Sequence, residues 1–474
     1  MKFAEFPYER PDLQTAMAQL DTLSRSISGA PTAEDAKKAF LSFEEIAEQI
    51  GSLSAICYVR HTVNTSDLFY EKENAFWDES LPLFTDKQLD IYRAMLSSPH
   101  HTALEQDLGK LLFTKMEIDV KSADPSIIPL MQEENGLQTE YQQLYASAQI
   151  PFAGKILTVA QLTPYKQDPN RAVRKAAFEA EGRFFDENRE KFDEIYDKLV
   201  KNRTKQARLM GYDNFIPLGY IRMKRNGYGI SEVEEYRKKI AEEIVPVVTQ
   251  LKKVQQRRIG ADSMQYFDDT FLFPDGNPVP FGNADEILAA GQQMYRALSP
   301  ETAEFIDFMF HSELFDVLAK EGKAPGGYCT YIPSQKSPFI FSNFNGTAGD
   351  VDVLTHEAGH AFAAYQAAKR ELLPEYADNT LEACEVHSMS MEFLTSDYHH
   401  LFFADQTDKY QLFHAESAVF FLPYGCVVDE FQHIVYGNPE LSPQQRNEAW
   451  MELEKKYRPY LTFGDLPFYG RGAG

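Results

Sequence analysis

The sequence predicts a mainly α-helical protein with a small β-sheet. Through much of the 474-residue chain, apolar residues recur three and four positions apart, which is the spacing of an amphipathic helix. Helix-start signals precede several of these segments, as in Thr32-Ala33-Glu34-Asp35. After the Gly326-Gly327 turn, the residue pattern changes from that of helices to that of strands. We expect two strands, at 328–332 and 339–344. These observations favour helices packed around a short strand pair.

The expected elements begin with helices between residues 11 and 99, whose outer faces carry alternating charges. A short hairpin is predicted within 150–159, where proline, glycine and β-branched residues replace the helical pattern. Asp168 is the expected N-cap of a long helix over 170–205. A bend or break near 186–188 is the alternative to a straight course.

Further helices are predicted in the middle of the chain. Ser231-Glu232-Val233-Glu234 is a capping box ahead of a helix that reaches Gly260. Pro246 should kink this helix, because proline lacks the amide hydrogen that the helix needs. Two more helices follow, at about 284–298 and 300–321.

The length of the chain exceeds that of one ordinary core, so two or three domains or one large bilobal body are expected. We place the boundary at about residue 195. The first domain is an N-terminal helical lobe over 1–195. The second domain, over 196–474, contains the histidine and glutamate side chains that could bind a metal or transfer a proton.

The composition excludes some classes of partner. The chain has 71 acidic and 47 basic residues, which give a formal net charge of −24. This charge repels the phosphates of nucleic acids and anionic lipids, so neither nucleic acid nor a membrane is an expected partner. The most apolar stretch, 420–428, is about half as long as a membrane span.

The cysteines and the N-terminus indicate the compartment. Cys57, Cys329, Cys384 and Cys426 are far apart and form no C-x-x-C pair, so neither a disulfide framework nor a thiolate zinc site is expected. The first residues contain acid and proline where a signal peptide needs an unbroken apolar run. We therefore expect a cytoplasmic protein.

A metal site is expected at residues 355–360, Thr-His-Glu-Ala-Gly-His. On a helix, His356 and His360 lie one turn apart on a single face, where two imidazoles can ligate one zinc ion. Glu357 follows the first histidine and can reach a water molecule at the metal without capturing the metal itself. The alternative is a helix that carries two histidines on a packed face.

A third ligand is expected on the next helix, which should start at Asn379 or Thr380. A short connection favours antiparallel packing, which brings this helix back towards the histidines. We take Glu385, 25 residues after His360, as the third ligand. Glu382, one turn earlier on the same face, is expected to orient a ligand imidazole by a hydrogen bond. The alternative for either glutamate is a side chain that faces solvent.

The segments 356–360, His-Glu-Ala-Gly-His, and 385–393, Glu-Val-His-Ser-Met-Ser-Met-Glu-Phe, resemble the thimet oligopeptidase and oligoendopeptidase F family of zinc metallopeptidases. The interval from the second histidine to Glu385 matches that of the family, and the resemblance covers about 150–474. It implies a bilobal, zincin-like helical fold, with the small β-sheet beside the motif helix and a deep channel that admits short peptides. It also implies that His356, His360 and Glu385 hold one Zn²⁺.

This resemblance implies an endopeptidase that hydrolyses internal bonds of short peptides. Zinc bound by two imidazoles and one carboxylate lowers the pKa of its water to about 7. Glu357 would act as the general base, taking a proton as this water attacks the carbonyl and passing it to the departing amine. The sequence does not indicate the oligomeric state.

Substrate contacts are expected from the second strand of the pair. Phe341, Ser342 and Asn343 could offer a free strand edge to the backbone of the substrate. The alternative is that this aromatic strand belongs to the core.

The C-terminal end departs from the family pattern. The family's donors to the oxyanion lie on a segment beyond this point, whereas the chain ends in a glycine-rich turn at 468–474. We therefore expect the C-terminal helices to be missing, which would leave zinc binding intact and weaken catalysis. Two other functions remain open: a zinc metallocarboxypeptidase, which would need a cation for the free carboxylate, and a catalytically weak fragment that binds peptides or zinc.

Overall fold

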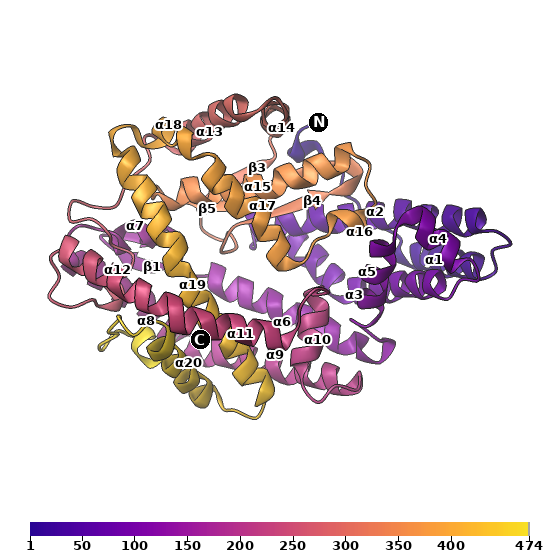
Figure 1. Ribbon diagram of the computed structural model, residues 1–474, viewed down its shortest axis with the longest axis horizontal. Coiled ribbons are helices and arrows are strands. Elements are labelled where there is room, and N and C mark those ends of the chain that lie inside the picture. The colour runs from indigo at the N-terminus through magenta and orange to yellow at the C-terminus, as the bar shows by residue number, and fades with distance from the viewer. Residues whose placement is uncertain (473–474) are drawn as a thin grey trace.

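The computed structural model describes residues 1–472, which form a mainly α-helical molecule with two small β-sheets, as predicted. Helices α1 to α5 gather at one end (Figure 1). In the same view, the larger sheet and helices α13 to α18 lie above α9 to α12 and α20, and α19 descends from the upper group to the lower one. None of the described helices is long and apolar enough to cross a membrane.

Helix α2 begins where its capping signal predicts, and α3 has a similar N-cap that the sequence analysis did not identify. Thr32 accepts a hydrogen bond from the amide of Asp35 at the start of α2, and Asp67 caps α3 in the same way. The bounds are α1 (Leu13–Ser28), α2 (Ala33–Val63), α3 (Leu68–Leu96), α4 (His101–Leu108), α5 (Lys110–Val120) and α6 (Ile128–Ala146).

The expected hairpin and the break in the long helix are both present. Strands β1 (Ile150–Phe152) and β2 (Lys155–Leu157) pair antiparallel. The long helix divides at Asn188, whose side chain donates to the carbonyl of Phe184, and its N-cap is Asn170 instead of Asp168. The bounds are α7 (Val159–Lys166), α8 (Arg171–Glu187), α9 (Arg189–Leu209) and α10 (Phe215–Arg222). Residue 195 thus lies inside α9, and the division of the chain there stays a prediction.

The helix with Pro246 accommodates the proline by a change of helix type. Between α11 (Ile230–Lys239) and α12 (Val245–Arg258), residues 240–244 form a π-helical turn, which supplies the wider backbone spacing that a proline ring needs. The prediction of a capping box at Ser231 was wrong: Gly229 is the N-cap, and its amide donates to the carboxylate of Glu232.

The segment over 300–321 differs from the prediction of a single helix. Helix α13 (Ala284–Leu298) is as expected, but α14 (Pro300–His311) ends early, and Glu313 follows it with a φ of 49°. The chain then enters strand β3 (Phe315–Leu318), which pairs parallel to β5 (Ser337–Phe344). The short apolar run Phe315 to Leu318 fits a helix or a strand equally well, and only pairing with β5 decides between them.

The three-stranded sheet has the order β3-β5-β4, in which β4 (Tyr328–Ile332) pairs antiparallel to β5. Helix α15 (Gly349–Lys369) packs against β5 and β4. The core between them includes Phe339, Phe341, Val351 and Ala358, each at most 1% exposed. Because this face of α15 is buried against the sheet, the motif histidines face α17 (Leu381–Leu394).

The remaining helices are two short ones in the upper group and two longer ones that reach the lower group (Figure 1). They are α16 (Pro374–Ala377), α18 (His400–Phe403), α19 (Thr407–Gly437) and α20 (Pro443–Tyr457). Helix α19 contacts α18, α20, α10 and α12, so it links segments that are distant in the sequence.

Candidate metal centre

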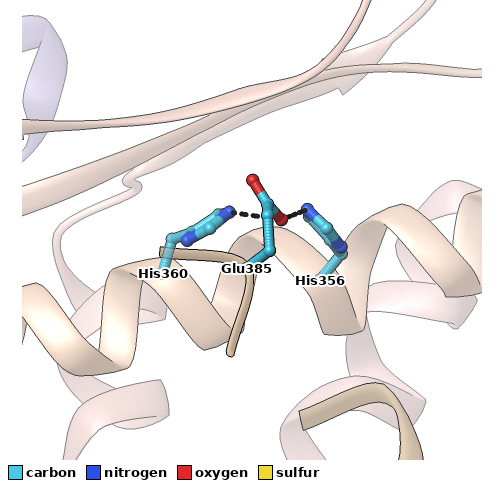
Figure 2. A group of neighbouring side chains, drawn as sticks. All are labelled: His356, His360 and Glu385. Carbon is cyan, nitrogen blue, oxygen red and sulfur yellow. Dashed lines mark ion pairs between the residues drawn. The ribbon is translucent and has the colours of Figure 1, made fainter. Parts of the chain in front are cut away.

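The two motif histidines lie on one face of α15. The rings of His356 and His360 are 5.0 Å apart between centroids and are inclined at 82°. Both side chains are partly buried and reach the space between α15 and α17 (Figure 2). The helical periodicity of the motif is sufficient to explain this placement.

Glu385 of α17 lies between the two imidazoles, as Figure 2 shows. Its Oε2 atom is 3.1 Å from Nε2 of His356 and 3.7 Å from Nε2 of His360. Thr380 caps the start of α17, at one of the two positions predicted. The structure therefore brings together the three side chains that the sequence analysis selected as ligands.

These three side chains fit a zinc ion by their chemistry and by their spacing. One nitrogen from each histidine and one oxygen of Glu385 all lie within 4.8 Å of one another. Two imidazoles and one carboxylate are a ligand set that catalytic zinc sites use. The side chain of Glu385 is 52% exposed, so the group is open to solvent on one side, as a site that admits water and substrate requires.

The pKa values of the two histidines shift in opposite directions. Burial lowers the pKa of His360, which favours the neutral ring that a metal needs. Burial also lowers the pKa of His356. A hydrogen bond to Glu392 and the charges of Glu357 and Glu385 outweigh this effect, so the pKa of His356 is raised.

Glu357 is buried, at 7% exposure, beside the start of β4. Burial, with a contribution from the charge of Glu385, raises the pKa of Glu357 to about 7. Its Oε1 atom would lie 3.4 Å from a Cβ atom added at Gly327, so Gly327 and the carboxylate are neighbours. A cavity of about 540 Å³ is lined by Gly326, Gly327 and Val353, and so extends beside Glu357.

Glu392 is a residue of the site that the sequence analysis missed. Nδ1 of His356 lies 2.7 Å from Oε1 of this buried carboxylate and donates to it. Because the two helices run antiparallel, the earlier histidine faces the later part of α17. Glu392 lies seven residues after Glu385 and therefore on the same face of α17, and this spacing was the signal that could have found it.

The prediction for Glu382 was wrong. Its carboxylate pairs with the guanidinium of Arg225, and the imidazole of His356 is oriented by Glu392 instead. Glu382 lies one turn closer to the start of α17 than Glu385 does. Because α15 and α17 are antiparallel, this end of α17 lies away from His356. The 43% exposure of its side chain agrees with a position at the rim.

The prediction of a free edge at Phe341, Ser342 and Asn343 was also wrong. These residues lie in β5, which is the central strand, because the unexpected strand β3 pairs on its other side. Phe341 and Ser342 are buried, and the side chain of Asn343 donates to the carbonyls of Ala324 and Gly326. The strand at the edge of the sheet is β4.

Comparisons with known proteins agree with this geometry. The model of the peptidase M3 N-terminal domain matches residues 3–123, and the model of peptidase family M3 matches 164–273 and 303–465. The match at 3–123 extends the similarity to a segment where the sequence analysis found none. No curated protein matches the chain.

Three solved structures are similar over almost the whole chain. A structure titled PZ peptidase A with inhibitor 2 has 47% identity and a TM-score of 0.98, covering 99% of this chain and 84% of that one. A putative oligoendopeptidase F has 46% identity and a TM-score of 0.98, covering 100% and 83%. A putative oligoendopeptidase F from Bacillus anthracis str. Ames has 47% identity and a TM-score of 0.95, covering 99% and 86%.

Proposed function

We propose that this chain, which belongs to peptidase family M3, is a zinc-dependent endopeptidase that hydrolyses internal bonds of short peptides. The observation that carries the proposal is the convergence of His356, His360 and Glu385 beside the buried Glu357. The similarity to two putative oligoendopeptidases F supports the same activity.

His356, His360 and Glu385 would hold one Zn²⁺. When bound, zinc supplies Lewis acidity towards the attacking water and the peptide carbonyl. The two histidines serve as neutral ligands through Nε2, and Nδ1 of His356 stays protonated because it donates to Glu392. Glu385 contributes the negative charge of the ligand set.

Glu357 is the general base. Its carboxylate accepts the proton of the attacking water and then passes it to the departing amine. A base works best when its pKa is near the working pH, and burial raises the pKa of Glu357 to about 7. Its position next to His356 in the motif keeps it close to the ligands without adding it to the ligand set.

The peptide backbone would extend along β4. This strand lies at the edge of the sheet, and its first residues adjoin Gly327 and Glu357. An extended peptide can add to such an edge through main-chain hydrogen bonds, which give affinity with little dependence on side chains. The glycine at position 327 leaves room for the backbone to approach the base.

Cleavage of internal bonds is favoured over removal of single C-terminal residues. A carboxypeptidase needs a cation for the free carboxylate of its substrate. Three cations near the start of α17 already have partners: Lys224 pairs with Asp378, Arg225 pairs with Glu382, and Lys115 donates to the carbonyl of Asp378. The charges of Lys224 and Arg225 are therefore largely neutralised.

A quenched fluorescent peptide with both ends blocked tests the proposal. We expect the zinc-loaded protein to cleave it and a chelator to abolish the cleavage. Cleavage only of peptides with a free C-terminus would indicate a carboxypeptidase. One bound zinc ion per chain without hydrolysis of either peptide would indicate a peptide- or zinc-binding protein.

A further inference from the structure

We propose that His414 is a positioning residue of the metal centre and acts through Glu392. The inference rests on the proposed function, because it concerns how the zinc ligand His356 is held. His414 belongs to α19 and is 5% exposed. Its Nε2 atom lies 2.6 Å from Oε2 of Glu392, while Oε1 of the same carboxylate accepts from His356 at 2.7 Å.

Glu392 therefore joins two imidazoles from two different helices. An ionised carboxylate only accepts hydrogen bonds, so both ring nitrogens that face it must donate. A single donor would leave the carboxylate free to rotate about its terminal bond. The second donor, on the other oxygen, fixes the plane of the carboxylate and with it the direction in which Nε2 of His356 points.

The burial of this group makes His414 costly to remove. Glu392 is 8% exposed, and an oxygen that loses its partner there is poorly reached by water. Without His414, Glu392 would have to turn one oxygen towards another donor or towards solvent. Either movement disturbs the hydrogen bond to His356.

His414 is itself held by its surroundings. Its ring lies 4.8 Å from that of Phe393 and 5.9 Å from that of Tyr410, which comes one turn earlier on α19. The hydroxyl of Tyr410 donates to Asp352 at 2.5 Å, and Asp352 lies one turn before His356 on α15. A single turn of α19 thus contacts both helices that carry the metal ligands.

This arrangement predicts a specific dependence on the donor atom. The amide nitrogen of glutamine can occupy the place of Nε2, whereas that of asparagine corresponds to Nδ1 and is too far from Glu392. Mutation of a residue that hydrogen-bonds a metal ligand typically lowers metal affinity by about 10- to 100-fold. His414 hydrogen-bonds such a residue, Glu392, and not the ligand itself. We therefore expect His414→Asn to raise the zinc dissociation constant about 10-fold and His414→Gln to stay close to wild type.

The experiment is a competition titration of the protein with zinc and a chromophoric chelator. The absorption spectrum of the cobalt-substituted protein is measured in parallel, because it reports the geometry of the ligands. Tyr410→Phe is the matched control, since it keeps the pair of His414 and Glu392 and removes only the contact to Asp352. Thermal unfolding of the metal-free variants reports any general loss of packing.

Weaker zinc binding and an altered cobalt spectrum in His414→Asn, both restored in His414→Gln, would support the proposal. Equal zinc affinity in wild type and His414→Asn would overturn it. So would a loss in His414→Gln as large as in His414→Asn, because the donor would then not matter. If the wild-type protein itself failed to bind zinc stoichiometrically, the proposed function would fail instead.

Discussion

Gly359 of α15 meets Ser388 of α17 at a distance that no other residue permits. A Cβ atom at position 359 would lie 2.7 Å from the Cα atom of Ser388 and 2.8 Å from the carbonyl oxygen of His387. Because both neighbours are backbone atoms, they cannot move without shifting α17. The glycine between the motif histidines therefore sets how close Glu385 comes to them.

Gly359→Ala should separate the two helices and weaken metal binding. Overpacking of this kind typically costs about 1–3 kcal/mol of the free energy of unfolding. Thermal unfolding and zinc titration would measure the two effects. Gly136→Ala is a suitable control, because Gly136 lies in α6 with no other atom within 4 Å of the added Cβ. We expect this control to be neutral or more stable by up to about 1 kcal/mol.

Glu357→Gln should remove the base and keep the metal. We expect turnover of the blocked peptide to fall by about 10²- to 10⁴-fold, because glutamine cannot accept the proton of the attacking water. Metal analysis should still find one zinc per chain. Cleavage at a rate close to that of the wild type would contradict the role of Glu357.

Glu385→Gln and Glu382→Gln should differ sharply, although the two residues are one turn apart. The first removes the charged ligand, so we expect a large loss of zinc affinity. The second should leave zinc affinity within about twofold, since Glu382 pairs with Arg225 and with none of the metal ligands. Comparable losses of zinc affinity in both variants would contradict the conclusion that Glu382 lies outside the metal site.

A buried pair of carboxyl groups, Glu44 of α2 and Glu375 of α16, should make stability depend on pH. Burial and the charge of Glu375 raise the pKa of Glu44 to about 10. Because the folded protein binds this proton more tightly than the unfolded chain, the stabilisation is complete below about pH 4 and is lost as the pH rises towards 10. We expect Glu44→Gln to remove this dependence.

Denaturant unfolding at several pH values between about 5 and 9 would measure the effect. The stability of Glu44→Gln relative to wild type should increase with pH, by at most about 1.4 kcal/mol per pH unit. Glu45→Gln, at the exposed neighbouring position of the same helix, should show no such trend. A constant difference between Glu44→Gln and wild type would contradict the raised pKa of Glu44.

The parts of the site that could be predicted are those that depend on local geometry. His356, Glu357 and His360 follow from the periodicity of one helix, which places residues four apart on the same face. Glu385 follows from a short connection and a family interval, which together return the next helix to the first. The capped starts of α2 and α17 were equally local, because a cap depends on the adjoining residues.

The parts that could not be predicted depend on pairing between distant segments. Strand β3 was assigned to a helix because its four residues have no decisive period, and this made β5 appear to be an edge strand. His414 could not be predicted as a partner of Glu392, because it lies on α19.

The sequence by itself determined the family, the mainly helical fold and the group of His356, Glu357, His360 and Glu385. The tertiary structure alone decided that β4 is the edge strand, that Glu382 turns to Arg225 and that Glu392 and His414 support His356. The physical reason is the range of the interactions. Helical periodicity acts within a few residues, whereas strand order and the hydrogen bonds of Glu382 and His414 join segments that meet only when the chain has packed.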